Sequence, residues 1–197
     1  MDRPSTREVS KCNRDGLRGR SYAQIARAHL DAIVFRNLNE SGSRDSTGTR
    51  LRARTMGKCY NSAVIDAPPD KVWRTIRDFH DLTWAAGVVT KAAVVGNLKG
   101  NQIGAKRVLN DAFHETLLSL DDHDHTLSYS IDDGPGPVAK DSVANYIGRW
   151  RVLPVTENNT TLVEFQSSFD APNAAAVSDF CNPIYQALLK ALKQHFS

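Results

Sequence analysis

The chain has 197 residues, of which 41% are hydrophobic and 24% are charged. This length fits one domain with a sizeable core, and the apolar content excludes a chain that is disordered throughout. The net charge of +3 is unevenly distributed, because residues 1–55 carry 12 basic and 6 acidic side chains and residues 56–197 carry 13 and 16. The basic character therefore belongs to an N-terminal leader, and we expect the working domain to span residues 56–197.

The leader has a composition typical of a flexible segment, with 11 arginines and a polar stretch at 41–48. Apolar residues at near-helical spacing predict one amphipathic helix over 21–38. The acidic residues of the leader argue against an organelle-targeting peptide, which should be poor in acids. A DNA-binding helix-turn-helix is another interpretation of residues 21–26, but no second periodic helix follows. We therefore expect an appended leader and no nucleic-acid partner.

Cys12, Cys59 and Cys181 form an odd, widely spaced set without a C-x-x-C motif. Such a set indicates free thiols in a reducing compartment, with neither a zinc site nor a disulfide framework. We accordingly expect a cytoplasmic protein. No run of residues approaches the roughly 18 apolar residues that a membrane helix needs, so no membrane span is expected.

From Cys59 onward, the pattern predicts regular secondary structure. A strand over 59–65 is followed by two prolines that suit the first turn of a helix, whose apolar face would be Val72, Trp73, Ile76 and Phe79. Gly, Asn, Asp and Pro turns then separate six strand candidates, at 88–95, 104–109, 113–120, 126–131, 142–155 and 160–169. A long helix over 173–196 closes the chain, and Pro183 should bend it or mark its first turn. The lack of βαβ alternation predicts an α+β fold with an antiparallel sheet.

Period-two alternation assigns one face of the last strands to the interior. That face carries aromatic side chains with polar tips, Tyr129, Tyr146 and Trp150, and the hydroxyl of Ser167. Buried polar groups need partners, which are either one another in an ordinary core or a ligand and water in a pocket. For the set as a whole, we expect a curved sheet around a partly hydrated pocket.

One predicted hairpin brings two opposite charges together. A three-residue loop at 110–112 would place Arg107 opposite Glu115, whereas a two-residue loop would place His114 there. On a solvated face the ion pair would only stabilise the sheet. If buried, it would anchor a hydroxyl or carbonyl of a ligand, or Glu115 would carry a proton with a raised pKa.

Other chemistry-bearing patterns are weak. The stretch from Asp121 to His125 crowds carboxylates and imidazoles, but no separate segment supplies further metal ligands, so a solvated turn is the better interpretation. Residues 56–197 lack a P-loop, a dinucleotide fingerprint and a G-x-S-x-G motif. The glycine-spaced stretch at 96–104 leads into a strand and not into a helix, so it is no phosphate cradle. We expect neither a metal nor a cofactor.

Five segments carry a pattern that is specific through its order and spacing. They are Ala67-Pro68-Pro69-Asp70-Lys71-Val72-Trp73 with Asp78-Phe79, Leu82 and Trp84; Gly104-Ala105-Lys106-Arg107; Glu115 through Asp122; Leu127 through Ile131 with Gly134 through Val138; and Glu164 through Asp170. Over about residues 58–197, the chain thereby resembles the polyketide cyclase/dehydrase-like branch of the START (SRPBCC) superfamily.

The resemblance implies a helix-grip fold, in which a seven-stranded antiparallel sheet wraps around a long C-terminal helix and encloses a hydrophobic cavity. It implies a protein that binds a hydrophobic small molecule such as a lipid, a polyketide or a related metabolite. The alternative is a cyclase or dehydratase-type enzyme in which Glu115 is the acid/base and Arg107 and Tyr146 polarise a substrate carbonyl. The oligomeric state stays open.

Carried over by position, the resemblance also implies a set of ligand-binding residues. Trp84 would sit near the mouth of the cavity, and residues 134–138 would form a mobile lid. The sequence departs from the family pattern where Ala85-Ala86 replace a frequent His-Pro and where Phe165 replaces a usual Trp, and both departures favour binding over catalysis. The expected ligand-binding residues are Trp84, Tyr129, Tyr146, Phe165, Phe180, Ile184, Tyr185 and Leu188.

Overall fold

The computed structural model describes residues 54–197, so the leader helix predicted over 21–38 lies outside the described residues. Seven antiparallel strands form one sheet in the order β1-β7-β6-β5-β4-β3-β2. The strands are β1 (Thr55–Ile65), β2 (Ala92–Val95), β3 (Lys106–Leu109), β4 (Phe113–Asp121), β5 (Thr126–Asp133), β6 (Ala144–Val155) and β7 (Thr160–Ala171). The helices are α2 (Pro69–Ile76), α3 (Ala174–His195) and two short 3₁₀ turns, η1 (Thr83–Ala85) and η2 (Gly136–Val138).

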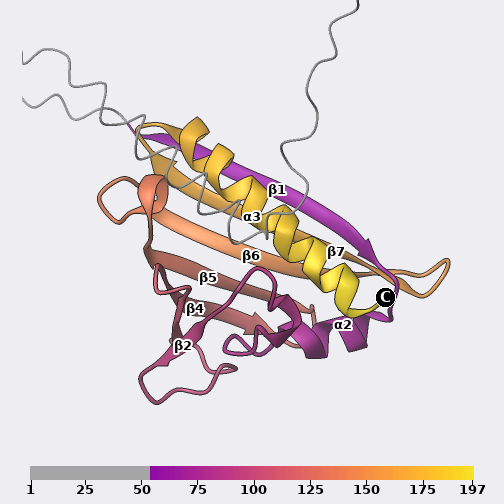
Figure 1. Cartoon of the computed structure of the whole chain (residues 1–197). Coiled ribbons are helices and arrows are strands. Elements are labelled where there is room, and N and C mark those ends of the chain that lie inside the picture. The colour runs from indigo at the N-terminus through magenta and orange to yellow at the C-terminus, as the bar shows by residue number, and fades with distance from the viewer. Residues whose placement is uncertain (1–53) are drawn as a thin grey trace, which may run out of the picture.

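The sheet curves around one long helix. Figure 1 shows α3 lying along one face of the sheet, with α2 at the end of the same layer. The predicted helix-grip architecture, with its antiparallel sheet and C-terminal helix, is confirmed. Within residues 54–197, no helix is both long and apolar enough to cross a bilayer.

Three predicted strands, now β2, β3 and β6, begin later than expected, and one, β1, begins earlier. Residues 88–91 precede β2 as a turn, because the backbone N–H groups of Val88 and Val89 donate to the carbonyl of Ala85. Gly104 has a φ of +90°, a left-handed conformation that a strand does not contain, so β3 begins after it. At the other end, β1 extends back to Thr55 because it pairs with β7 along its whole length.

The helices also refine the predictions. Helix α2 has Pro69 in its first turn as predicted, but it ends at Ile76, and Phe79 lies beyond it with its N–H donated to the carbonyl of Gly100. Phe79 is nevertheless buried. Helix α3 begins where the side chain of Asn173 accepts a hydrogen bond from the N–H of Ala176. Pro183 lies well inside α3 and not in its first turn.

The core lies between the inner face of the sheet and a stripe of buried side chains on α3. The predicted alternation holds on β6, where Tyr146, Gly148 and Trp150 are buried and Asn145 and Arg149 are exposed. A Cβ on Gly148 would lie 2.4 Å from Cζ of Tyr129. The glycine therefore leaves room for the Tyr129 ring to lie over β6. The buried stripe on α3 is Val177, Cys181, Tyr185, Leu188, Leu189 and Leu192.

Candidate functional site

A buried ion pair joins β3 and β4. The hairpin has the predicted three-residue loop, and Arg107 lies opposite Glu115 in the register of the two strands. The loop closes because Asn110 and Asp111 adopt positive φ angles of 53° and 56°, which these residue types tolerate. The Nε and Nη2 atoms of Arg107 each lie 2.7 Å from Oε2 of Glu115. The side chains are only 9% and 6% exposed, so water does not screen this pair.

The Arg107 guanidinium also contacts Phe79 and Tyr129. Its Nη1 donates to the backbone carbonyl of Phe79, and its central carbon lies 3.8 Å from the centroid of the Phe79 ring and 5.8 Å from that of Tyr129. Burial raises the pKa of Glu115 above its ordinary value, and the positive charge of Arg107 opposes that rise. The site therefore holds a fixed cation beside a carboxyl group that takes up a proton more readily than in water.

Beyond the ion pair lies a continuous group of buried aromatic side chains, which we call the ring cluster. Phe165 stacks between Trp150 and Tyr185, with centroid distances of 3.9 Å and 3.8 Å. The edge of Trp84 meets Trp150 at 5.9 Å. Phe79 is 6.0 Å from Tyr129, which is 6.3 Å from Phe165, so the rings connect to the ion pair. The ring cluster consists of Trp84, Tyr129, Tyr146, Trp150, Phe165 and Tyr185.

Most polar tips of the ring cluster are satisfied within the protein. The hydroxyl of Tyr146 hydrogen-bonds that of Tyr185 and lies 3.2 Å from both Oγ of Ser167 and Sγ of Cys181. Burial raises the pKa of Tyr146 and Tyr185 well above the ordinary value, so both phenols stay neutral. The indole Nε1 of Trp84 differs, because it is buried and finds no hydrogen-bond partner among residues 54–197.

The structure brings together most, but not all, of the predicted ligand-binding residues. Trp84, Tyr129, Tyr146, Phe165 and Tyr185 all belong to the ring cluster. The other three lie elsewhere on α3, where Leu188 is buried, Ile184 is half-buried, and the Phe180 ring centroid is 6.3 Å from that of Phe113.

Where the sequence predicts a cavity, the rings of Trp150, Phe165 and Tyr185 lie in face-to-face contact and leave no space between them. A groove of about 350 Å³ lies elsewhere, between β1 and α3. Its lining residues are Asn61, Ser62, Ala63, Gln186, Leu189, Lys190 and Lys193, and it includes no predicted site residue.

Two features of this region were not predicted. Phe79 contacts Arg107 with both its carbonyl and its ring, although the sequence places it only on a helix face. The one sequence signal that could have assigned Phe79 to the site is the Asp78-Phe79 pair, which belongs to the first segment that resembles the family pattern. The sequence analysis placed Trp150 on the inner face of the sheet but not among the ligand-binding residues. Its place on the same face of the strand as Tyr146 is the signal that could have added it to that set.

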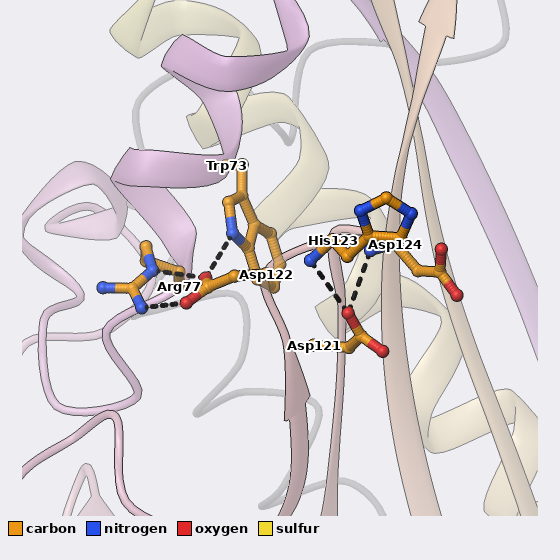
Figure 2. A network of polar contacts seen from close by, with 6 residues as sticks. All are labelled: Trp73, Arg77, Asp121, Asp122, His123 and Asp124. Atoms are coloured by element: carbon orange, nitrogen blue, oxygen red, sulfur yellow. Dashed lines mark hydrogen bonds and ion pairs between the residues drawn. The ribbon is translucent and has the colours of Figure 1, made fainter.

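The acidic and histidine-rich stretch forms the turn between β4 and β5, as predicted (Figure 2). The carboxylate of Asp121 accepts the backbone N–H groups of His123 and Asp124, at 2.8 Å and 3.0 Å. Asp122 accepts hydrogen bonds from Nε1 of Trp73 and from Nε and Nη2 of Arg77, and these bonds lower its pKa. The turn thus fastens α2 to the sheet. Over the described range 54–197, no three His, Cys, Asp or Glu side chains are grouped to hold a metal ion.

The comparisons with known proteins agree with this architecture. The family model described as polyketide cyclase / dehydrase and lipid transport matches residues 56–197. A solved protein from Nitrosospira multiformis is similar, with 38% identity, a TM-score of 0.69 and coverage of 71% of this chain and 96% of the other. The comparison with curated proteins finds no match.

More distant structures share the fold. The protein XoxI from Bacillus cereus has 27% identity and a TM-score of 0.59, with coverage of 71% of this chain and 95% of the other. Norcoclaurine synthase from Thalictrum flavum, solved in complex with dopamine and hydroxybenzaldehyde, has 12% identity and a TM-score of 0.59. The match covers 78% of this chain and 95% of that enzyme.

Proposed function

The chain belongs to the polyketide cyclase / dehydrase and lipid transport family, and from that premise we propose that residues 56–197 bind an aromatic or otherwise apolar small molecule that carries a hydroxyl or carbonyl group. Family and fold are those of proteins that bind hydrophobic ligands. The ligand would lie against the ring cluster, with its oxygen at the Arg107–Glu115 pair.

The observation that carries this proposal is the burial of the ion pair within an aromatic core. A buried ion pair contributes little to stability, because the loss of hydration offsets its attraction, and apolar residues of similar volume often serve the fold as well or better. Packing alone therefore gives no reason for Arg107 and Glu115 to lie here. A neutral oxygen-bearing ligand gives one, since a hydroxyl can accept from the guanidinium and donate to the carboxylate.

A second observation points to a polar atom on the ligand. A buried N–H without a partner costs about 1–3 kcal/mol relative to one that is hydrogen-bonded, and Trp84 carries such a group at the edge of the ring cluster. An acceptor on the ligand would relieve that cost. Norcoclaurine synthase, which shares the fold, is solved with two aromatic compounds of modest size, and this supports the proposed ligand class.

The ring cluster is closed in this structure, so binding must replace ring–ring contacts by ring–ligand contacts. Rings in offset stacks gain about 0.5–1.5 kcal/mol per pair beyond their buried area. A flat aromatic ligand that inserts between two stacked rings forms two such contacts for the one it breaks. An aromatic ligand can therefore open the cluster with less loss than a bulky aliphatic one.

The proposal is tested with two probes that differ in one oxygen, 2-naphthol and naphthalene. A hydrogen bond to a charged group contributes about 1.5–3 kcal/mol, so 2-naphthol should bind at least about tenfold more tightly than naphthalene. Isothermal titration at neutral pH measures both affinities. Equal affinities would show that the ion pair does not recognise the oxygen, and failure of both probes to bind would remove the proposal for aromatic ligands.

Catalysis is the second candidate, and the raised pKa of Glu115 favours it. A carboxyl group whose pKa moves toward neutrality suits a general acid or base, and Arg107 beside it would polarise a carbonyl. For any substrate that is turned over, Glu115→Gln should abolish turnover while binding changes little. Equal losses of binding and turnover would assign Glu115 to recognition instead.

A further inference from the structure

Two cysteines that are far apart in the sequence meet in the core. Cys59 lies on β1 and Cys181 on α3, and their exposed fractions are 3% and 2%. Each thiol shifts the pKa of the other, which indicates that the two sulfur atoms lie within interaction distance. Cys181 meets the ring cluster at the hydroxyl of Tyr146, which lies 3.2 Å from its Sγ atom, and the proposed ligand site uses neither cysteine.

Contacts on both sides of the pair hold α3 over β1 at this point. Before the cysteines, Oγ of Ser178 donates to the carbonyl of Lys58 at 3.4 Å. After them, Nδ2 of Asn61 donates to Oδ1 of Asn182 at 2.8 Å. The helix and the strand are thus fastened on either side of the two sulfur atoms, which keeps the thiols facing each other.

The sheet closes a third side of the pair. Cys59 is directly opposite Ser167 in the register of β1 and β7. The hydroxyl of Tyr146 lies 3.2 Å from both Oγ of Ser167 and Sγ of Cys181. The two cysteines therefore share the neighbourhood of the Ser167 and Tyr146 hydroxyls in the core, where β1, β6, β7 and α3 meet.

We propose that Cys59 and Cys181 are a redox-active dithiol, which a small peroxide converts into a disulfide that joins β1 to α3. The thiolate of Cys59 attacks one oxygen of hydrogen peroxide, the O–O bond breaks, and a sulfenic acid and hydroxide form. The sulfur of Cys181 then attacks the sulfenic sulfur, the S–S bond forms, and water leaves with the thiol proton of Cys181. In sum, two thiols are oxidised to one disulfide while one peroxide is reduced to two waters.

The electrostatics of the pair divide these two roles between the cysteines. The hydrogen bond from Cys181 lowers the pKa of the Cys59 thiol, which favours Cys59 as the attacking thiolate. The same hydrogen bond, together with burial, raises the pKa of Cys181. Cys181 thus carries the thiol proton of the reduced pair, and this proton leaves with the sulfenic oxygen as water when the S–S bond forms.

The experiment uses the full-length chain with Cys12→Ser, which removes the third thiol. The protein is treated with hydrogen peroxide at neutral pH, unfolded in denaturant with an alkylating agent, and examined by intact mass and peptide mapping. We expect a mass loss of about 2 Da, protection of both cysteines from alkylation, and one cross-linked peptide that contains Cys59 and Cys181. Dithiothreitol should restore both thiols, and thermal unfolding should shift to higher temperature only in the oxidised form.

Two results would overturn the proposal. One is that both cysteines remain free to alkylate after peroxide treatment, and the other is that Cys59 gains oxygen atoms while Cys181 stays reduced and no cross-linked peptide forms. Cys181→Ala in the same background is the matched control, in which Cys59 should stop at its oxidised, uncross-linked forms. Because 2-naphthol is not part of this experiment, the result is independent of the proposed ligand site.

Discussion

Replacing both members of the buried ion pair should separate a structural role from recognition. The perturbation is Arg107→Met and Glu115→Leu, each alone and together, since these residues keep the approximate volume of the originals without their charge. Both side chains are less than a tenth exposed, so solvent screening does not reduce the expected effects. Removal of one partner leaves a buried group without its counter-charge and should lower the free energy of unfolding by about 3–5 kcal/mol.

The double variant should behave differently. Loss of the desolvation penalty stabilises the protein by about 1–4 kcal/mol in comparable replacements. Against this, the Phe79 carbonyl loses the donor that Arg107 supplies, which costs about 1–3 kcal/mol. The two effects nearly cancel, so the double variant should unfold within about 2 kcal/mol of the wild type.

Urea denaturation followed by tryptophan fluorescence measures these free energies, and far-ultraviolet circular dichroism checks that the fold is kept. In the same double variant, 2-naphthol should lose its preference over naphthalene. The reasoning is refuted if the double variant is as unstable as the sum of the single variants, because the pair would then be structural. It is also refuted if the double variant retains the wild-type preference for 2-naphthol.

Three further changes test other parts of the account. The pKa of Glu115 is raised above 4.5 in the folded protein. Above pH 4.5 the native state therefore keeps a proton that the unfolded chain releases. The free energy of unfolding should consequently fall as the pH rises from 4.5 toward 7. Glu115→Gln should lack this slope in urea denaturation between pH 4.5 and 7, and the opposite slope in the wild type would contradict the raised pKa. Gly148→Ala should lower the free energy of unfolding by about 1–3 kcal/mol, because the added Cβ would lie 2.4 Å from the Tyr129 ring. Gly87→Ala is the control, and it should leave the free energy of unfolding nearly unchanged, because a Cβ there meets no atom within 4 Å. Asp122→Ala should lower the free energy of unfolding by about 1 kcal/mol, because the indole N–H of Trp73 loses its acceptor. This change should not affect the binding of 2-naphthol. Weaker binding of 2-naphthol would show that the turn contributes to the ligand site.

The fold was largely predictable because its signals are local and periodic. Alternation on β6 identified the buried face residue by residue, and alternation on β7 did so except at Glu164, which is also buried. The turn residues between the two strands marked the hairpin. The pairing of Arg107 with Glu115 followed from counting a three-residue loop, once that loop was chosen over a two-residue one. Each of these inferences spans only a few residues.

The details that failed depend on contacts between distant segments. Periodicity placed Phe79 on a helix, but its N–H is taken by Gly100 and its ring by Arg107, so the helix ends before it. The meeting of Cys59 with Cys181 depends on how α3 crosses β1, which no local pattern encodes. In the same way, alternation shows that Phe165 points inward, but not that Trp150 and Tyr185 close on both its faces where a cavity was expected.

The most direct test of the central claim is a titration with 2-naphthol monitored by the indole N–H signals in nitrogen-edited nuclear magnetic resonance spectra. The chain has three tryptophans, of which Trp84 and Trp150 lie in the ring cluster and Trp73 is bound to Asp122 outside it. The account predicts that the Trp84 and Trp150 signals shift, because the ring of the ligand lies against the ring cluster, while the Trp73 signal stays in place. Unchanged Trp84 and Trp150 signals at a saturating concentration of 2-naphthol would contradict it.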